Sequence, residues 1–307
     1  MRSALRRNEM SERIDFNVEK DGFSAHFYPG TKKPGKAIIY TGGAGCPEKV
    51  CVRAGQFLVR EGYSVMILGF YLWKGLPKEL HRIPVDYVER AAKWLNVHGY
   101  TEICLMGTST GAGYTLLCAS LVPAITKVIA VVPFDYVMES MKKMVNHTGT
   151  SVYEYHGKDM PYSTYPLADK GGLRGALREV RKMPGYGLKY FMRAAYDTAI
   201  LNPDSRIRVE NINGDILFIH PDWDDSWPSE TAVKRMKKVL EESGFSHTVK
   251  SIEYPGASHA LGSWEDMPLK FRFALRFACT RDRENPKICK EARKKSTRDI
   301  LDELENW

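Results

Sequence analysis

The sequence predicts an α/β fold built on a mostly parallel, doubly wound sheet. Short apolar runs bounded by Gly or Pro alternate with segments whose apolar residues recur at helical spacing. One such run leads directly into Gly107-Thr108-Ser109-Thr110-Gly111, a Gly-x-Ser-x-Gly pattern. The chain has 307 residues, 43% of them hydrophobic, which is enough for a large core, so we expect a single domain over residues 1–307.

Each expected element has a local signal. Ile14 to Phe27 alternates loosely around Asp21-Gly22, which predicts a hairpin at the start of the sheet. Further apolar runs predict strands at 36–40, 63–70, 103–106, 127–132, 215–220 and 248–254. Helical spacing predicts helices at 48–61, from Pro84 onward, and at 114–122, 229–243, 269–279 and 297–307. Gly62 is placed as a C-terminal cap, and Pro84 as the first residue of its helix.

The alternation of strands and helices stops between residues 133 and 208. This segment is rich in Tyr, Gly, Pro and Met, with helices expected near 173–181 and 188–199. An insertion at this point lies over the carboxyl ends of the strands, where α/β sheets bind ligands. We therefore expect a cap or lid over residues 133–208; an elaborate surface connection is the alternative.

Ser109 stands where a nucleophile elbow requires a serine. An apolar strand precedes it and a buried-type helix follows, so the turn exposes the hydroxyl. Small residues are needed on either side because the flanking backbones come close together. An ordinary turn serine before a helix is the alternative interpretation.

A serine hydroxyl needs a base, and the base needs a carboxylate that fixes its tautomer. In the α/β-hydrolase fold the three groups follow successive strands in the order Ser, Asp, His. His259 follows the last expected strand, and an Asp cluster follows the strand before it. We expect Asp224 to be the acid, with Asp225 as the alternative, since spacing alone does not separate them.

The backbone around this site predicts an oxyanion hole. Thr41-Gly42-Gly43-Ala44-Gly45 follows a strand and is poor in side chains, so the N–H of Gly43 or Ala44 can turn toward a reacting carbonyl. The N–H of Thr110, next to the nucleophile, is the expected second donor.

At these positions the chain resembles the family of acyl-CoA thioester hydrolases and bile acid-CoA:amino acid N-acyltransferases, from about Lys36 to about Gly262. The matching stretches are Gly75 to Lys78 with Ile83-Pro84, Gly107 to Gly111, Tyr155 to Tyr162, Asp215 to Pro228, and Tyr254 to His259. The family places its acid third after the glycine that ends the strand. Pro221 stands at that glycine here, so the resemblance favours Asp224.

Three departures from the family accompany this resemblance. Animal members carry an additional N-terminal β domain, for which the chain upstream of Lys36 is too short. The amino acid transferases carry Cys at the nucleophile, so Ser109 favours hydrolysis over aminolysis. Pro221 at the strand end and a long polar C-terminal extension point to a different substrate. A looser resemblance links the chain to dienelactone hydrolases and carboxylesterases.

We therefore expect a serine hydrolase that cleaves acyl thioesters of the acyl-CoA type, or esters, through an acyl-enzyme and without a cofactor. The alternatives are a carboxylesterase or dienelactone-hydrolase-like enzyme that does not use coenzyme A, and a non-catalytic ligand-binding protein of the same fold. Lys74 and Lys158 are candidates to bind the phosphates of coenzyme A. The side chains expected around an apolar acyl group are Tyr71, Trp73, Tyr162, Trp223, Trp227 and Trp264.

Composition excludes several other classes. Lys and Arg exceed Asp and Glu by eight, but no aromatic-basic motif accompanies the charge, so we expect no nucleic-acid partner. Neither a secretory signal in Met1 to Arg13 nor a run of about 18 apolar residues is found, which predicts a cytoplasmic protein without a membrane span. The six cysteines lack a Cys-x-x-Cys pair and are expected to be free thiols. His220 lacks a second His at ligand spacing, so no metal site is expected.

Overall fold

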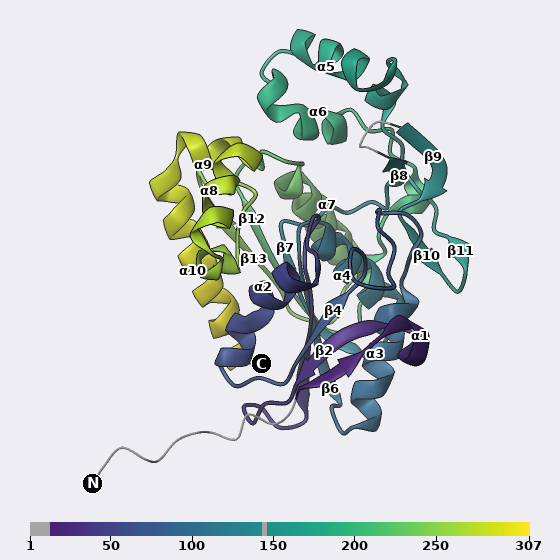
Figure 1. Cartoon of the computed structure of the whole chain (residues 1–307), viewed down its shortest axis with the longest axis vertical. Helices are drawn as coiled ribbons and strands as arrows, with labels where there is room; N and C mark the ends of the chain where they lie inside the picture. Colours follow the sequence, from purple (N-terminus) through teal and green to yellow (C-terminus); the bar gives the residue numbers. More distant parts are fainter. Residues whose placement is uncertain (1–12, 143–145) are drawn as a thin grey trace.

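The computed structural model describes residues 13–142 and 146–307, and these form an eight-stranded sheet in the order β1-β2-β4-β3-β6-β7-β12-β13 (Figure 1). The strands are β1 (Ile14–Phe16), β2 (Ser24–Tyr28), β3 (Lys36–Thr41), β4 (Val65–Gly69), β6 (Glu102–Thr108), β7 (Ile125–Val131), β12 (Asp215–Pro221) and β13 (Val249–Tyr254). Neighbouring strands from β4 to β13 are parallel, whereas β1 and β2 are antiparallel additions at one edge. The predicted mostly parallel sheet is confirmed.

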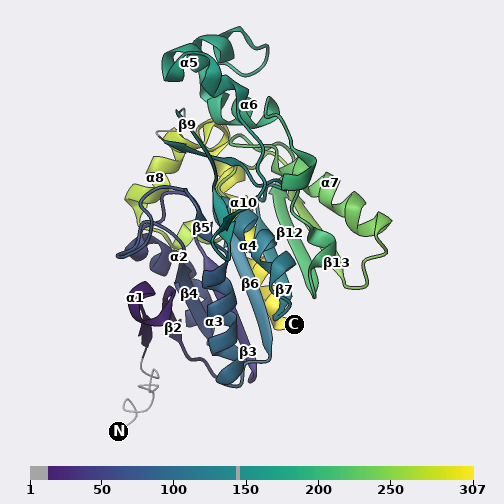
Figure 2. The same cartoon turned by 90° about the vertical axis from the view of Figure 1, so that its right-hand side faces the viewer.

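Helices cover both faces of the sheet, with α2 and α10 on one face and α3, α4 and α7 on the other (Figures 1 and 2). The helices are α1 (Val18–Asp21), α2 (Glu48–Arg60), α3 (Asp86–Val97), α4 (Thr110–Leu121), α5 (Gly172–Lys182), α6 (Phe191–Asp197), α7 (Ser229–Glu242), α8 (Leu269–Ala278), α9 (Thr280–Glu284) and α10 (Pro286–Glu305). Because both faces are covered, consecutive residues such as Ile38-Ile39 and Val128-Ile129 are all fully buried.

Three local predictions differ from the structure. The expected hairpin around Asp21-Gly22 contains the short helix α1, and Gly22 is its left-handed cap. The helix expected from Pro84 begins at Asp86, because Ile83-Pro84 forms strand β5, which pairs with β10. The last helix begins at Pro286, eleven residues before the expected 297, because many basic residues obscure the apolar stripe of its first half.

The segment between β7 and β12 rises above the carboxyl ends of the strands (Figures 1 and 2). Helices α5 and α6 agree with the helices predicted there, and they share a small apolar core made by Leu167, Ala176, Val180 and Ala194. The segment also holds strands that the sequence did not predict, because they are short and partly polar: β8 (Glu139–Lys142), β9 (Asn146–Ser151), β10 (Tyr153–Tyr155) and β11 (Lys158–Asp159).

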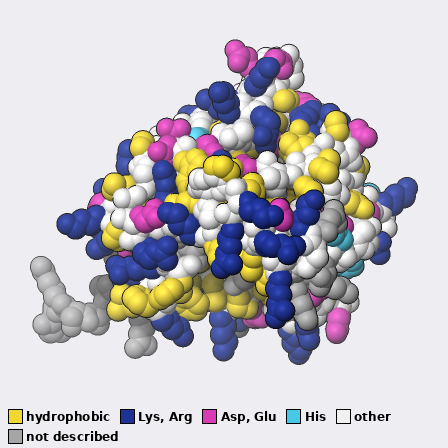
Figure 3. Space-filling model, turned by 90° about the horizontal axis from the view of Figure 1, so that it is seen from above, with side chains coloured by type: hydrophobic (Ala, Val, Ile, Leu, Met, Phe, Trp, Pro, Cys, Tyr) yellow, Lys and Arg dark blue, Asp and Glu magenta, His cyan; other side chains and the backbone are white. Residues whose placement is uncertain are grey.

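Charged side chains of both signs are mixed on the molecular surface. On the face seen in Figure 3, Lys and Arg side chains are interspersed with acidic and hydrophobic ones. Within the described ranges, no helix is both long enough and apolar enough to cross a bilayer. All six cysteines are free thiols, as predicted.

Candidate active site

Ser109 occupies a sharp turn between β6 and α4. Its φ of 59° and ψ of −126° are strained for a residue with a side chain. A Cβ atom on Gly107 would lie 2.2 Å from the carbonyl oxygen of Gly111, and one on Gly111 would lie 2.2 Å from that of Gly42. Only glycine fits at both positions, and the turn therefore presents the Ser109 hydroxyl at the carboxyl edge of the sheet.

His259 lies beside this hydroxyl. Its Nε2 is 2.8 Å from Ser109 Oγ, and its Nδ1 is 2.9 Å from each carboxylate oxygen of Asp224. Because a carboxylate only accepts hydrogen bonds, Nδ1 carries the proton and Nε2 is free to accept from the serine. A continuous chain of hydrogen bonds thus links Asp224, His259 and Ser109.

The two neighbouring aspartates have different partners. Asp224 is fully buried and accepts hydrogen bonds from Ser229 Oγ at 2.6 Å and from the N–H of Ser226 at 2.9 Å, besides the His259 ring. Asp225 instead accepts the backbone N–H of His259 at 2.9 Å and that of Arg281 at 2.8 Å. Asp224 therefore faces the imidazole, while Asp225 holds the loop that carries it.

Burial and the neighbouring charge have opposite effects on the pKa of Asp224 and on that of His259. Burial raises the pKa of Asp224, but the adjacent His259 and the hydrogen bonds to Ser229 and Ser226 leave that pKa below its usual range. Burial lowers the pKa of His259, but the charge and hydrogen bond of Asp224 leave it above the ordinary value. Burial raises the pKa of Asp225. The pair Asp224–His259 is thus arranged to stabilise an imidazolium beside a carboxylate.

The predicted oxyanion donors lie around the same hydroxyl. A Cβ atom built on Gly43 would lie 3.7 Å from Ser109 Oγ, so the loop of Gly43 and Ala44 faces the serine closely. Thr110 is the first residue of α4, where the N–H has no acceptor within the helix. The backbone of Gly43 and that of Thr110 therefore both lie beside the Ser109 side chain.

Two cavities meet at Ser109. The first, of about 180 Å³, lies between the start of α4 and the segment from β8 to α6, and Thr110 and Trp227 line it. The second, of about 250 Å³, lies between the Gly43-Ala44 loop, α2 and α8, and His259 lines it. Ser109 therefore borders both cavities, and His259 lines only the second.

The sequence model of the family described as BAAT / acyl-CoA thioester hydrolase, C terminal, matches residues 83–264, more than half of the chain. The chain belongs to this family. Acyl-coenzyme A thioesterase 1 of Mus musculus is 27% identical over 66% of this chain and 44% of its own length. Peroxisomal succinyl-coenzyme A thioesterase of Mus musculus is 28% identical over 74% and 48%. The chain thus spans about half the length of these relatives.

The fold of this chain is similar to that of a solved structure from another protein. A putative dienelactone hydrolase from Klebsiella pneumoniae superposes with a TM-score of 0.50 at 16% identity, over 81% of this chain and 87% of that one. The predicted family and the α/β-hydrolase fold are confirmed.

Two of the six aromatic side chains expected at the substrate line a cavity next to Ser109, and one of them, Trp264, lines the second cavity. Trp227 lines the first cavity beside Ser109. Tyr71 and Trp73 are buried in the main core, Tyr162 packs against that core, and Trp223 is only partly buried. These four line neither cavity, because a loop position after a strand does not reveal which way its side chain points.

An arginine from the inserted segment reaches the acid loop, which sequence reasoning missed. Arg193 on α6 is buried and donates to the backbone oxygen of Asp224 at 2.8 Å and to Glu230 at 2.7 Å. Glu230 in turn accepts the N–H of Asp224 at 3.2 Å. The pair therefore ties the insertion to the residue that faces His259. No local pattern signals a contact between residues so far apart in the sequence.

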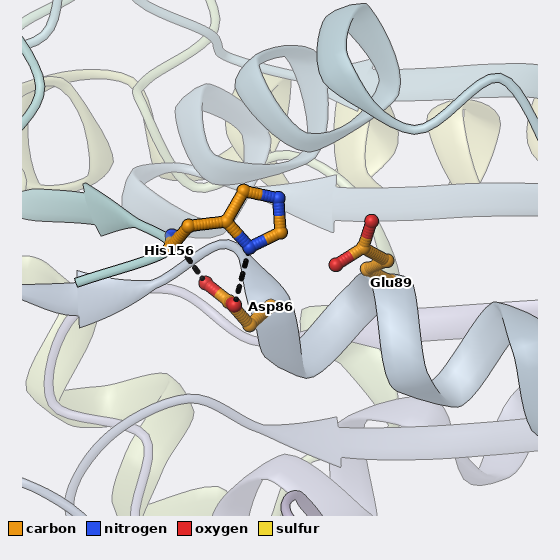
Figure 4. A group of neighbouring side chains, drawn as sticks. All are labelled: Asp86, Glu89 and His156. Carbon is orange, nitrogen blue, oxygen red and sulfur yellow. Dashed lines mark hydrogen bonds and ion pairs between the residues drawn. The ribbon is translucent and has the colours of Figure 1, made fainter. Parts of the chain in front are cut away.

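A second polar cluster lies away from Ser109, where Asp86, Glu89 and His156 bring three potential ligand atoms within 4.8 Å of one another (Figure 4). Asp86 accepts from His156 Nδ1 and from its backbone N–H, each at 3.1 Å, and the other ring nitrogen faces away from that carboxylate (Figure 4). Glu89 accepts from the hydroxyl of Tyr155 at 3.1 Å. These contacts account for the cluster as an anchor for the β10–β11 turn.

His220, the other histidine near acidic residues, is also engaged. Its Nδ1 is 2.9 Å from the carbonyl oxygen of Pro221, and its Nε2 is 3.1 Å from Ser251 Oγ.

Proposed function

We propose that this chain is a serine hydrolase that cleaves acyl thioesters of the acyl-CoA type, or esters, through an acyl-enzyme on Ser109. The observation that carries the proposal is the continuous hydrogen-bonded chain from Ser109 Oγ through His259 to the fully buried Asp224. The strained turn at Ser109 and membership of the family support it.

The reaction follows from the roles of these groups. His259 Nε2 takes the proton of Ser109 while Oγ attacks the acyl carbon, and Asp224 stabilises the imidazolium that forms. The N–H of Thr110, with that of Gly43 or Ala44, holds the oxyanion. The imidazolium then protonates the leaving group, and water repeats the sequence to release the acid and restore the serine.

The two cavities suggest where the acyl group and the leaving group of the substrate bind. The leaving group must depart next to His259 Nε2, because that nitrogen supplies its proton. His259 and the Gly43-Ala44 loop line only the second cavity. The leaving group therefore exits on that side, and the acyl group occupies the first cavity, with residues 133–208 serving as its lid.

A specific observation favours the alternative of an ester hydrolase that does not use coenzyme A. Among the described residues that line the two cavities there is no Lys or Arg. Lys74 and Lys158, the candidates for binding phosphates, are exposed and line neither cavity. A ligand with several phosphates would have to find its cationic partners outside these cavities.

The test is turnover of matched acyl-CoA thioesters and p-nitrophenyl esters by the intact protein and by Ser109→Ala. We expect Ser109→Ala to lose about a million-fold in kcat, as when other serine nucleophiles are removed, and to lose labelling by a fluorophosphonate. Ser120→Ala, a buried serine on the same helix, is the matched control and keeps both. Activity retained in Ser109→Ala overturns the mechanism, while a preference for the plain ester selects the alternative substrate.

A further inference from the structure

The first cavity is lined by aromatic and large aliphatic side chains in similar numbers among the described residues. Its rings are those of Trp227 and of six residues of the inserted segment: Phe134, Tyr136, Tyr153, Tyr165, Phe191 and Tyr196. A space that needed only to exclude water would be served equally by branched aliphatic side chains. The concentration of rings therefore bears on what the cavity holds.

Tyr196 is the centre of this arrangement. Its ring meets Tyr165 at 5.3 Å and 81°, Phe134 at 4.9 Å and 76°, and Trp227 at 5.2 Å and 61° between centroids and planes. These four rings line the cavity, and aromatic rings favour offset or edge contacts with further rings. A planar ring gains these contacts in the cavity, whereas a saturated chain gains only burial.

The size of the cavity points the same way. It has a volume of about 180 Å³. Apolar protein cavities of about 150 Å³ hold benzene. A single ring with a short link to the reacting carbonyl matches this space, while a long aliphatic chain would have to extend outside it.

One carboxylate interrupts the apolar wall. Glu139 on β8 lines the cavity and is only 4% exposed. It accepts from His147 Nδ1 at 2.5 Å and from the N–H of Gly149 at 3.2 Å. A carboxylate has about four acceptor positions, so these two contacts leave room for a further donor. An alkyl chain sealed against Glu139 would remove water from it without replacing the hydrogen bonds, whereas a hydroxyl would donate one.

We infer that the acyl group of the substrate is aromatic and carries a hydroxyl group on its ring. The ring lies among the aromatic side chains around Tyr196, and its hydroxyl donates to Glu139. This inference rests on the proposed function, because it assigns the acyl group to the first cavity.

The experiment compares kcat/KM for p-nitrophenyl esters of 4-hydroxyphenylacetate, phenylacetate, cyclohexylacetate and octanoate. The common leaving group removes coenzyme A from the comparison. We expect the hydroxylated aryl ester to be preferred over phenylacetate, and phenylacetate over cyclohexylacetate, each by about tenfold. Glu139→Leu removes every acceptor of this side chain and abolishes the preference for the hydroxyl. Tyr196→Leu abolishes the preference for the aromatic ring. Glu89→Leu, at a carboxylate outside both cavities, is the matched control and keeps both ratios.

Octanoate or cyclohexylacetate turned over as well as the aryl esters by the unaltered protein overturns the inference, whatever the variants do. Binding of 4-hydroxyphenylacetamide and octanamide to Ser109→Ala, measured by calorimetry, separates it from the proposed function. Tighter binding of the aryl amide, with neither esters nor acyl-CoA thioesters turned over by the unaltered protein, supports the inferred ligand and overturns hydrolysis. Tighter binding of octanamide overturns the inference alone.

Discussion

At the scale of single residues, the site depends on two carboxylates that are adjacent in sequence and different in task. Asp224 contacts the ring of His259, whereas Asp225 contacts only its backbone. The difference arises because the chain turns immediately after β12, so consecutive side chains point to opposite sides of the loop. Charge placed at Asp224 raises the pKa of His259 against the effect of burial.

This charge predicts a shift in pH dependence. In the unaltered protein the pKa of His259 lies above its ordinary value, so the basic form, and with it kcat/KM, is lost as the pH falls through that raised pKa. Asp224→Asn removes the main raising charge, so the acidic limb should move to lower pH while kcat falls by about 10⁴-fold. Asp222→Asn, on the same loop but paired with Arg281, is the control in which the acidic limb of the kcat/KM–pH profile stays in place. If this acidic limb does not move in Asp224→Asn, the account of the His259 pKa is wrong.

At the scale of elements, the turn at Ser109 is set by the close approach of β3, β6 and α4. The backbone of Gly111 in α4 packs against the end of β3, so the first turn of the helix has no space for a side chain there. The contact between Gly111 and Gly42 therefore joins the first turn of α4 to the loop that contains Gly43.

Two glycines of the same helix make this testable. In Gly111→Ala the new Cβ meets the carbonyl oxygen of Gly42 at 2.2 Å, and we expect the free energy of unfolding to fall by about 1–3 kcal/mol. In Gly113→Ala the nearest atom is 3.8 Å away, and alanine raises helix stability by up to about 1 kcal/mol. Urea unfolding of both variants measures the difference. Equal effects at the two positions would refute the packing argument.

At the scale of the whole molecule, the C-terminal helix α10 closes one face of the sheet through a buried ion pair. Lys127 of β7 has a side chain only 3% exposed, and its Nζ is 2.6 Å from Glu303 of α10. Glu303 also meets Lys250 of β13 at 2.8 Å. The helix thus joins two strands that carry the loops of the site, and above the carboxyl ends of the strands Arg193 joins the insertion to Asp224.

The ion pair predicts an asymmetric response to mutation. Glu303→Leu leaves Lys127 buried without its close partner, and we expect the free energy of unfolding to fall by about 3 kcal/mol. The double variant Lys127→Met/Glu303→Leu replaces the pair by apolar side chains and should recover most of that loss. Urea unfolding of the single and double variants tests this. A double variant no more stable than the single one would show that the pair itself, and not the orphaned charge, sets the stability.

Much of the fold was predictable from local patterns. Strands such as β3 and β7 were found because burial on both faces of the sheet gives a continuous run of apolar residues. Helices such as α2 and α7 were found because burial on one face makes apolar residues recur at helical spacing. The strands of the insertion were missed because β8, β10 and β11 are short and partly polar. The beginning of α10 was missed because its apolar stripe is diluted by basic residues.

The sequence by itself determined the fold class, the family and the order of Ser109, the aspartates and His259, because each of these depends on residue type and spacing along the chain. Only the tertiary structure decided that Asp224 faces the imidazole and that Arg193 reaches the acid loop. It also decided that, of six expected aromatic side chains, Trp227 and Trp264 line the cavities beside Ser109. The physical reason is that these contacts join residues far apart in the chain through side-chain directions, and spacing carries no information about direction.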